Sequence, residues 1–485
     1  MSIKPIIFEE PELEFGEGYR HQDPRQGLVN AGPHQVALGE SLSIGIVGSA
    51  ATTEKAVTFL EEIAAGVDAK DSTLPNLHQP FPGLGNANPF RVRFDLPEDA
   101  RRALSKSVVE SICKEVSDER AVEAAVTACV EGMTELAQSS SKPDIILLPL
   151  SIKLIERLVN ARSRNRQKAD KEDSGGSSAP DFRALLKARA RHLPFGFQIV
   201  WEDVLDEKVK VPRRLKEAAN RQIQHKAARA WNLLNSLYFK ATHRVPYRRW
   251  VPDDALKACY IGLSFYRDLT GQQLYTSSAQ MFDERGKGYI LRGKRALTES
   301  CGRRPYMAEE DARQLVRQVL TAYRTEHRHS PARVMILKTS RFRQEEVDGI
   351  SEALAEAGVE LKDLVWIQER HPLRVFRDGS YPVLRGTFID IGQRGLLYTQ
   401  GSIPYLGTYP GVYVPNPLLI CPHDVSESTV TDIAREIFSL TKVNWNSTAM
   451  NQRHPAPLRA ARKVGEVLKY LSEDDDVSPE YWRYM

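Results

Sequence analysis

The stretch from Ser439 to Gly465, SLTKVNWNSTAMNQRHPAPLRAARKVG, is the most informative part of the chain. Ahead of it and at its start, Ile433, Ile437 and Leu440 recur at helical spacing, which predicts the end of an amphipathic helix. The stretch then places a tryptophan between two asparagines, breaks at two prolines and restarts as an arginine-rich helix. Core packing requires none of this polar detail, so we expect the stretch to contact a polar ligand.

Composition limits the classes of protein to consider. The 485 residues suffice for two or three domains, and 41% hydrophobic with 27% charged residues is typical of a soluble globular protein. The net charge is only +4, so any nucleic-acid-binding surface must come from local clustering of basic residues. The five cysteines form no CxxC pair, which argues against a zinc site or a disulfide framework. No apolar run approaches the roughly 20 residues that span a bilayer, and no signal-peptide pattern opens the sequence. We therefore expect a cytoplasmic protein without a membrane partner.

Short apolar runs alternate with helical patterns, which predicts an α/β fold. In the first half, residues 42–50, 144–151 and 195–205 predict buried strands, and one long helix is expected from about Arg213 to Ala241. Residues 163–181 are charged and Gly/Ser-rich, which predicts a flexible surface loop. A second set of strands follows. We place the boundary between residues 241 and 255, which gives regions 1–245 and 246–485.

The sequence GIVGSA, residues 45–50, invites comparison with a phosphate-binding loop. It lacks the lysine of GxxxxGK[ST] and the full GxGxxG pattern, so a tight turn from strand to helix is the favoured interpretation. The alternative, an α/β nucleotide-binding enzyme, leaves the second half of the chain unexplained.

The second half has a recognisable order of motifs. A first strand with a glycine, YIGLSF, is followed by SSAQMFDERGKGYILRG, then by VMILKTSRFRQEE, and finally by LTKVNWNST with its Pro-x-Pro turn and basic helix. This order resembles the PIWI domain of Argonaute proteins, which has an RNase H-like fold. Residues 228–250 look like the join between the MID and PIWI domains, and residues 13–33 are similar to the start of short prokaryotic Argonautes. The resemblance implies a Rossmann-like MID domain followed by an RNase H-like PIWI domain.

In Argonautes the opening stretch lies along the nucleic-acid channel. Asparagine and arginine suit that place because phosphates and 2′-hydroxyls accept hydrogen bonds whatever the base sequence. Trp445 has an alternative interpretation as a core residue. The resemblance and the basic helix together predict contacts to the nucleic-acid backbone for Arg221, Arg229, Arg244, Arg248, Asn444, Asn446 and Arg459.

An active PIWI domain holds two divalent metal ions with four side chains, mostly carboxylates. At three of the family's positions this sequence has Ser264, Thr339 and Arg462. Two hydroxyls and a cation cannot replace anionic ligands, so we expect no catalytic metal pair and no nuclease activity. An active guide-directed nuclease is the alternative.

The family's MID domain holds the 5′-phosphate of a guide strand, and the resemblance places five residues in that pocket. Arg183 and Lys187 share a helix face at i, i+4 spacing, and both can bind phosphate oxygens. Gln198 and Lys240 follow at family spacing. In many relatives the terminal carboxylate reaches this pocket with a bound Mg²⁺ ion, which implies the carboxylate of Met485 here.

The resemblance implies a guide-loaded sensor. Its guide is expected to be a small RNA and its target single-stranded DNA, with the guide, not the protein, reading the target sequence. Short Argonautes of this kind act in prokaryotic immunity with a partner that carries an APAZ domain fused to an effector. That effector is a TIR or sirtuin-like NAD-hydrolysing domain, or a nuclease.

Overall fold

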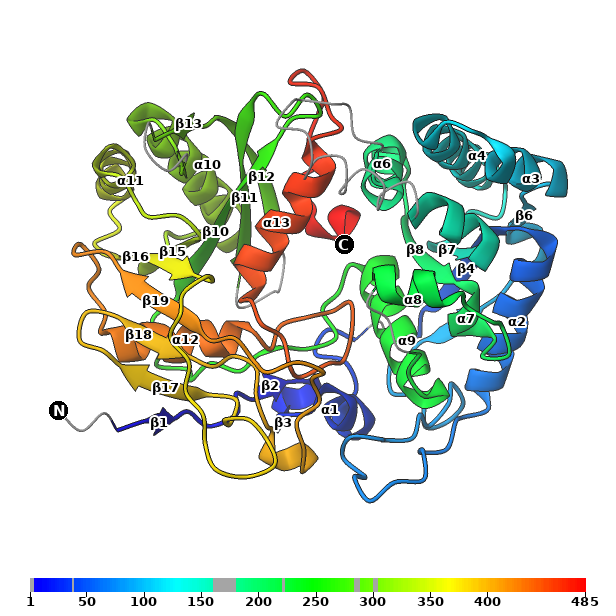
Figure 1. Cartoon of the computed structure of the whole chain (residues 1–485), viewed down its shortest axis with the longest axis horizontal. Helices are drawn as coiled ribbons and strands as arrows, with labels where there is room; N and C mark the ends of the chain where they lie inside the picture. The colour runs from blue at the N-terminus through cyan, green and yellow to red at the C-terminus, as the bar shows by residue number, and fades with distance from the viewer. Residues whose placement is uncertain (1–3, 37–38, 160–179, 220–222, 283–287, 300–303) are drawn as a thin grey trace.

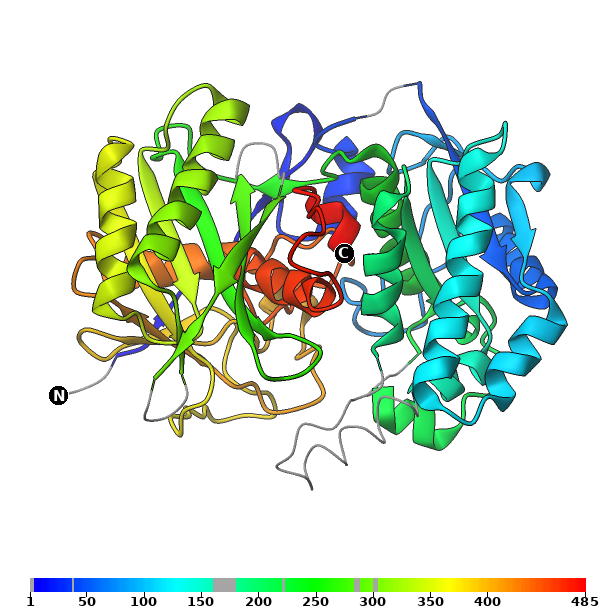
Figure 2. The same cartoon turned by 90° about the horizontal axis from the view of Figure 1, so that it is seen from above.

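The computed structural model describes residues 4–36, 39–159, 180–219, 223–282, 288–299 and 304–485. Residues 163–179 of the predicted surface loop, and Arg221, lie outside these ranges. The described chain forms two α/β halves, each built on its own sheet, with helix α13 (Ala456–Leu468) and the C-terminal residues between them (Figures 1 and 2). In the described part of the chain no helix is both long and apolar enough to cross a bilayer.

The first half is built on a parallel sheet. Its strands lie in the order β5 (Arg93–Asp95), β4 (Ser41–Gly48), β7 (Ile145–Leu150) and β8 (Gly196–Trp201), with β6 (Arg101–Ala103) also paired to β4. The core residues of β7 are buried on both faces, as the continuous apolar run predicts for a parallel strand. The three strands expected in this half are confirmed.

Helices cover both faces of this sheet. On one face α2 (Ala50–Ala64) and α9 (Lys226–Thr242) share a hydrophobic core with β4, and on the other α4 (Asp118–Gln138) and α6 (Phe182–Arg189) pack against β7. Ser49 caps the start of helix α2, and its side chain accepts a hydrogen bond from the backbone N–H of Thr52. At Gly48 a Cβ atom would lie 2.8 Å from Cγ of Pro149. The motif GIVGSA is therefore a tight turn from strand to helix, as predicted.

The single long helix expected from Arg213 to Ala241 is wrong. The structure has two helices instead, α8 (Arg213–Ala219) and α9. Before α9 the chain bends, so that Asn232 donates a hydrogen bond back to Gln224, 2.8 Å away. Helix propensity continues through this segment, but packing of the apolar face of α9 decides where the helix begins.

The second half is built on a nine-stranded mixed sheet. Its strands lie in the order β1 (Ile6–Ile7), β17 (Thr387–Asp390), β18 (Gly395–Leu397), β19 (Leu418–Pro422), β16 (Leu361–Gln368), β15 (Arg333–Lys338), β10 (Ala258–Arg267), β11 (Leu274–Phe282) and β12 (Gly288–Arg295). Strands β10, β15 and β16 are parallel and the other pairings are antiparallel.

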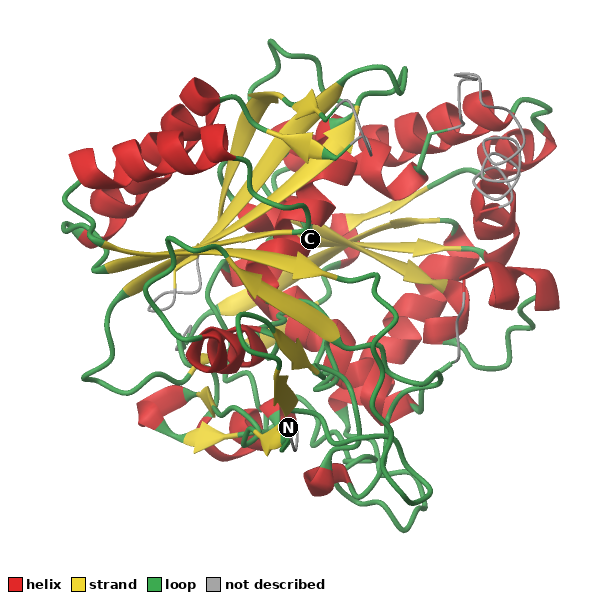
Figure 3. Ribbon diagram, turned by 60° about the vertical axis from the view of Figure 1, so that its left-hand side comes forward, coloured by secondary structure: helices red, strands yellow, loops and turns green. Residues whose placement is uncertain are grey.

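Four helices cover this sheet. One face carries α10 (Glu309–His327) and α11 (Gln344–Glu356), and the other carries α12 (Val430–Leu440) and α13 (Figure 3). Helix α13 lies directly on β10, because a Cβ atom at Gly262 would collide with the carbonyl oxygen of Pro457. The glycine of the first strand therefore sets how closely the C-terminal helix approaches.

The N-terminal segment does not stay with the first half, although region 1–245 was expected to contain it. Strand β1 pairs with β17 of the second sheet. Strand β2 (Leu13–Glu14) pairs with β3 (Arg20–His21) and β9 (Arg248–Arg249), and α1 (Pro24–Ala31) follows.

A buried ion cluster explains this placement. A carboxylate oxygen of Glu10 lies 2.7 Å from Lys442 and 3.1 Å from Arg385, and both cations are almost fully enclosed. The N-terminal segment therefore neutralises charges that belong to the second half.

The smaller elements complete the described chain. They are the helices α3 (Lys106–Lys114) and α7 (Glu202–Leu205), the strands β13 (Leu297–Thr298) and β14 (Pro305–Tyr306), and the 3-10 turns η1 (Gly16–Gly18), η2 (Glu98–Ala100), η3 (Ala190–His192), η4 (Pro404–Leu406) and η5 (Tyr481–Tyr484).

Candidate nucleic-acid interface

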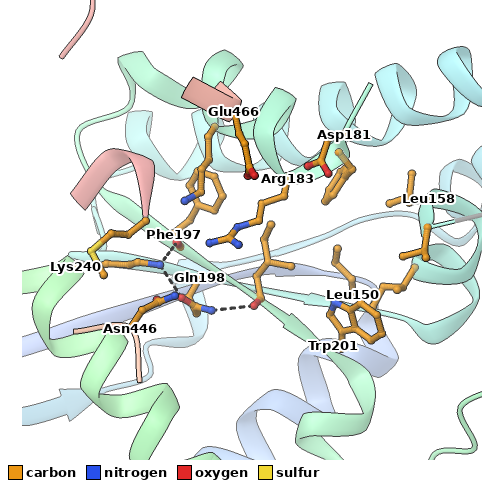
Figure 4. Close-up of a pocket in the computed structure, with 16 residues that line it drawn as sticks. Leu150, Leu158, Asp181, Arg183, Phe197, Gln198, Trp201, Lys240, Asn446 and Glu466 are labelled. Carbon is orange, nitrogen blue, oxygen red and sulfur yellow. Dashed lines mark hydrogen bonds between the residues drawn. The ribbon is translucent and has the colours of Figure 1, made fainter. Parts of the chain in front are cut away.

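A cavity of about 360 Å³ lies where the two halves meet. Strand β8 and helix α6 form its walls from the first half, and Asn446, Glu466 and Met485 close it from the second (Figure 4). The structure brings all five residues of the predicted phosphate pocket to this cavity: Arg183, Lys187, Gln198, Lys240 and Met485.

The charge on Lys187 is the most unusual feature of the cavity. This side chain is 6% exposed, and among the described residues its buried ammonium nitrogen has no hydrogen-bond partner. Burial, together with the positive charges of Arg183 and Lys240, holds the pKa of Lys187 well below its ordinary value. A buried cation without a partner is costly, so the site suits an anion.

Lys240 reaches the same space from α9. Its ammonium group lies 2.7 Å from Oε1 of Gln198 and 3.3 Å from the carbonyl oxygen of Phe197 (Figure 4). Ser236 donates to the same Gln198 oxygen at 2.9 Å and lies 2.9 Å from Oδ1 of Asn446. These contacts fix Gln198 and Asn446 in place, and burial followed by the charge of Arg183 lowers the pKa of Lys240 well below its ordinary value.

The sequence analysis missed a further cation, Lys463 of α13. Burial, followed by the charges of Arg183 and Arg459, lowers the pKa of Lys463 to about 7, while Glu466 opposes the shift. The i, i+4 spacing of Arg459 and Lys463 was available in the sequence as a signal that both lie on one helix face. The charges of Arg183, Lys187, Lys240 and Lys463 all act on one another here.

The opposite wall of the cavity is apolar. Figure 4 shows Leu150, Leu158 and Trp201 on one side, and Lys240, Gln198 and Asn446 on the other. A cavity with a cationic side and an apolar, partly aromatic side suits a ligand that joins an anion to a planar ring.

Met485 is 2% exposed and is held by the turn that precedes it. Trp482 stacks on His243 with ring centroids 4.1 Å apart, and Arg483 donates to the carbonyl oxygen of Leu193 at 2.8 Å. The aromatic residues of the tail therefore dock against the first half. Mg²⁺ prefers oxygen ligands, and the described residues contain no group of three His, Cys, Asp or Glu side chains that could hold a metal ion. The side chains around Met485 fit an anion, and its carboxylate is the ligand that a magnesium ion would need.

Trp445 is a core residue, as the alternative interpretation held. It is 2% exposed, its ring lies 4.7 Å from that of Phe239, and its indole N–H donates to the carbonyl oxygen of Tyr247 at 2.8 Å. Asn444 accepts a hydrogen bond from the backbone N–H of Asn446 at 3.2 Å, which orders the turn between the two halves. Of this turn, Asn446 lines the cavity.

Four of the arginines predicted to contact the nucleic-acid backbone have partners within the chain. Arg229 is 5% exposed and pairs with Glu207 at 2.9 Å, so it supports the fold and is not a surface contact. The other arginines of this set also have partners within the chain. Arg244 pairs with Glu40 at 2.8 Å, Arg248 pairs with Glu14 at 2.9 Å, and Arg459 donates to the carbonyl oxygens of Val443 and His454.

The three positions at which the sequence predicts replaced metal ligands lie within β10 (Ser264), directly after β15 (Thr339) and in the middle of α13 (Arg462). Ser264 is 8% exposed, and its carbonyl oxygen accepts a hydrogen bond from Ser277 at 3.4 Å. Thr339 follows β15, and its carbonyl oxygen accepts a hydrogen bond from Trp366 at 3.1 Å. Arg462 pairs with Glu369 at 2.6 Å. Sequence reasoning missed Glu369, which directly follows β16.

No protein-family model matches the chain. A stretch of 170 residues is 29% identical to the Argonaute protein of Thermus thermophilus and covers 33% of this chain and 23% of that protein.

Solved structures match over nearly the whole chain. Clostridium butyricum Argonaute bound to a guide DNA and a 19-mer target DNA has a TM-score of 0.63, with 14% identity over 99% of this chain and 55% of that chain. Aquifex aeolicus Argonaute has a TM-score of 0.58, with 14% identity over 99% and 56%. Marinitoga piezophila Argonaute in complex with a 5′-OH guide RNA has a TM-score of 0.55, with 14% identity over 99% and 59%. This chain therefore spans little more than half the length of these proteins. The structural match confirms the predicted fold, a MID-like half followed by a PIWI-like half.

Proposed function

Because the chain is homologous to Argonaute proteins, we propose that it binds a small guide RNA by its 5′-phosphate and pairs it with single-stranded DNA. The observation that carries the proposal is the buried ammonium group of Lys187. It shares a cavity with Arg183 and Lys240 and has no hydrogen-bond partner in the part of the chain that the structure describes. A phosphate would neutralise these charges and accept their hydrogen bonds.

Each residue of the cavity has a role in this proposal. The guanidinium of Arg183 forks onto two phosphate oxygens, while Lys187 and Lys240 supply positive charge, to which the neighbouring Lys463 adds. Gln198 is held by Lys240 and Ser236, so its amide is oriented before a guide arrives. The apolar wall with Trp201 accepts the first base of the guide.

Met485 supplies the protein ligand that we propose for a magnesium ion, its terminal carboxylate. If Mg²⁺ binds, the carboxylate of Met485 and the guide phosphate hold it, because the neighbouring side chains Lys187 and Lys240 are cationic. Its contribution is to neutralise charge on the phosphate.

We also propose that the chain does not cut nucleic acid. Ser264 and Thr339 offer neutral hydroxyls where a metal pair needs anionic ligands, and Arg462 brings a positive charge that repels divalent cations. Glu369, which could serve as a ligand, is paired with Arg462.

Catalysis would then belong to a partner. We propose a protein with an APAZ domain and a TIR, sirtuin-like or nuclease effector, which target pairing activates in prokaryotic immunity. The support is the resemblance to short Argonautes in the motifs of both halves. Pairing changes the shape of the bound nucleic acid, and a partner that contacts the duplex can respond to that difference.

Sequencing the bound nucleic acid tests the central proposal. The protein is purified from cells, and the co-purified nucleic acid is extracted, digested with RNase or DNase and sequenced. We expect short RNA with a uniform 5′-phosphorylated end. Release of mononucleotides without any oligonucleotide would favour the alternative, an α/β nucleotide-binding enzyme.

Co-expression with an APAZ-domain effector tests the partner. The two proteins are co-purified and assayed for NAD hydrolysis and for nuclease activity with guide RNA and matched single-stranded DNA. A target with a scrambled sequence is the control. Activity that appears only with the matched target supports the sensor, whereas failure to co-purify together with target-independent activity would leave guide binding alone.

A further inference from the structure

Three arginines lie near Glu369, between the end of β16 and helix α13. Arg374 follows β16, Arg453 precedes α13, and Arg462 lies within α13. We call Arg374, Arg453 and Arg462 the arginine cluster. Glu369 pairs with Arg462 at 2.6 Å and with His454 at 2.7 Å, and its backbone carbonyl accepts a hydrogen bond from Arg453 at 3.2 Å.

The charges of this cluster do not balance. The acidic side chain of Glu369 attracts Arg453, while Arg462 and Arg374 both repel it. Burial and these like charges lower the pKa of Arg453 against the opposing effect of Glu369. The Nε atom of Arg453 is also buried, and it has no hydrogen-bond partner among the residues that the structure describes.

Glu369 carries a negative charge within the cluster. Burial acts to raise its pKa, but the hydrogen bond of His454 and the charge of Arg462 hold the pKa of Glu369 at about 2. The carboxylate is therefore ionised at every physiological pH, and a net positive charge remains around it. An excess of arginine with unused N–H donors is the arrangement that binds phosphate.

The cluster is also close to the guide cavity. Arg453 stands seven positions after Asn446, which lines the cavity, so their Cα atoms are at most about 25 Å apart. This is less than the roughly 34 Å of one duplex turn. A nucleic-acid duplex anchored in the cavity can therefore reach the cluster.

We infer that the arginine cluster binds a backbone phosphate of the target strand at the place where an active relative would hold its metal ions. The inference rests on the proposed function, because it requires a guide-paired target. In an active nuclease the metal ions hold the phosphate and activate the nucleophile. The arginines would hold the phosphate but would supply no nucleophile. An acidic segment of a protein partner is a different ligand for the same cluster, and the test separates the two.

The first experiment compares Arg453→Gln and Arg374→Gln with a matched control, Arg435→Gln, on the wild-type background. Arg435 lies on α12 with 58% of its side chain exposed and loses the same charge from the same half. Guide affinity is measured first, and then the affinity of the guide-loaded protein for matched single-stranded DNA across a salt series. We expect unchanged guide affinity and about tenfold weaker target binding for each cluster variant. The slope of log affinity against log salt should fall by about 0.7 to 0.9 for each lost contact.

The second experiment replaces single target phosphates by neutral methylphosphonates. At one or two adjacent linkages we expect the replacement to weaken wild type but to have no additional effect in Arg453→Gln, since both changes remove the same contact. Melting curves of the variants serve as the check on folding, and the exposed Arg374 provides a second site if Arg453→Gln is unstable.

Different failures have different meanings. If wild type binds no guide, the proposed function fails. The inference is overturned by the following result. Guide binding is normal, both cluster variants bind target as well as Arg435→Gln does, and at every linkage the methylphosphonate weakens binding as much in Arg453→Gln as in wild type. Loss of effector co-purification with unchanged target binding would overturn it in favour of an acidic protein segment.

Discussion

The ammonium nitrogen of Lys338 lies 2.5 Å from Oε1 of Glu346, and neither side chain has exposed surface. Glu346 also accepts hydrogen bonds from the backbone N–H groups of Met307 and Arg343, both at 2.9 Å. The pair therefore joins the end of β15 to the start of α11, immediately beside Thr339.

Replacing Lys338 by alanine should destabilise the protein by about 3–5 kcal/mol, because the buried carboxylate of Glu346 loses its counter-charge. Denaturant unfolding measures the free energy. Arg435→Ala breaks the exposed pair with Asp432 and should cost little. Equal losses in both variants would contradict a structural role for the buried pair.

Lys187→Ala or Lys240→Ala should weaken binding of a 5′-phosphorylated guide by about 2–5 kcal/mol, since each removes a buried partner of the phosphate. Lys226→Ala is the control, because Lys226 begins the same helix as Lys240 and pairs with Glu62. Binding of labelled guides, with and without the phosphate, gives the comparison. A wild type that binds 5′-phosphorylated and 5′-hydroxyl guides equally well would rule out the phosphate pocket.

The affinity advantage of a 5′-phosphate should decline as the pH rises from about 7 to 9. Lys463 has a pKa of about 7 without a guide, and a bound phosphate raises it, so binding takes up a proton above pH 7. Titrations of both guides across this range measure the advantage. Lys463→Gln should flatten the decline, and an unchanged pH profile in that variant would exclude Lys463 from the site.

The stability of the guide-free protein should change in the opposite direction. Because the folded protein holds the pKa of Lys463 at about 7, below its value of about 10.4 in an unfolded chain, the unfolded state binds more protons between these values. The free energy of unfolding should therefore rise with pH in this window, and less so in Lys463→Gln. Chemical unfolding at several pH values provides the measurement.

Purified protein with guide, complementary target and Mg²⁺ or Mn²⁺ should leave both strands intact. The reason is that we expect the metal-ligand positions to be Ser264, Thr339 and Arg462, which offer two neutral hydroxyls and a cation. Gel analysis of labelled strands detects any product. Cleavage opposite the middle of the guide that a chelator abolishes would show that other residues hold the metals.

Much of the fold follows from the sequence, because buried strands leave a local signal. Continuous apolar runs marked β4, β7 and β15, and each is a strand of a sheet. The broken helix before α9 left no such signal, since residues 213–241 keep good helix-forming composition throughout. Contacts with distant segments decided that boundary.

The candidate site was predictable only in part, because some of its contacts join residues that are far apart in the sequence. Arg183, Lys187, Gln198 and Lys240 could be placed by spacing and resemblance, and they meet in one cavity. The ion-pair partners of charged residues could not be predicted in this way. Glu40 and Glu14 lie more than 200 residues before Arg244 and Arg248, so no local pattern shows that these arginines are already paired. A basic stretch in sequence therefore does not establish a basic surface.

The pairing of β1 with β17 has a consequence for how the chain is made. Ile6 faces Phe388, so the partner strand leaves the ribosome about 380 residues later. At about 5–20 residues per second, the N-terminal segment waits roughly 20–75 s for that strand. During that interval Glu10 has neither Arg385 nor Lys442, and the first sheet can fold while the segment before it stays unpaired. Synthesis of the second half therefore determines when the beginning of the chain becomes part of the native structure.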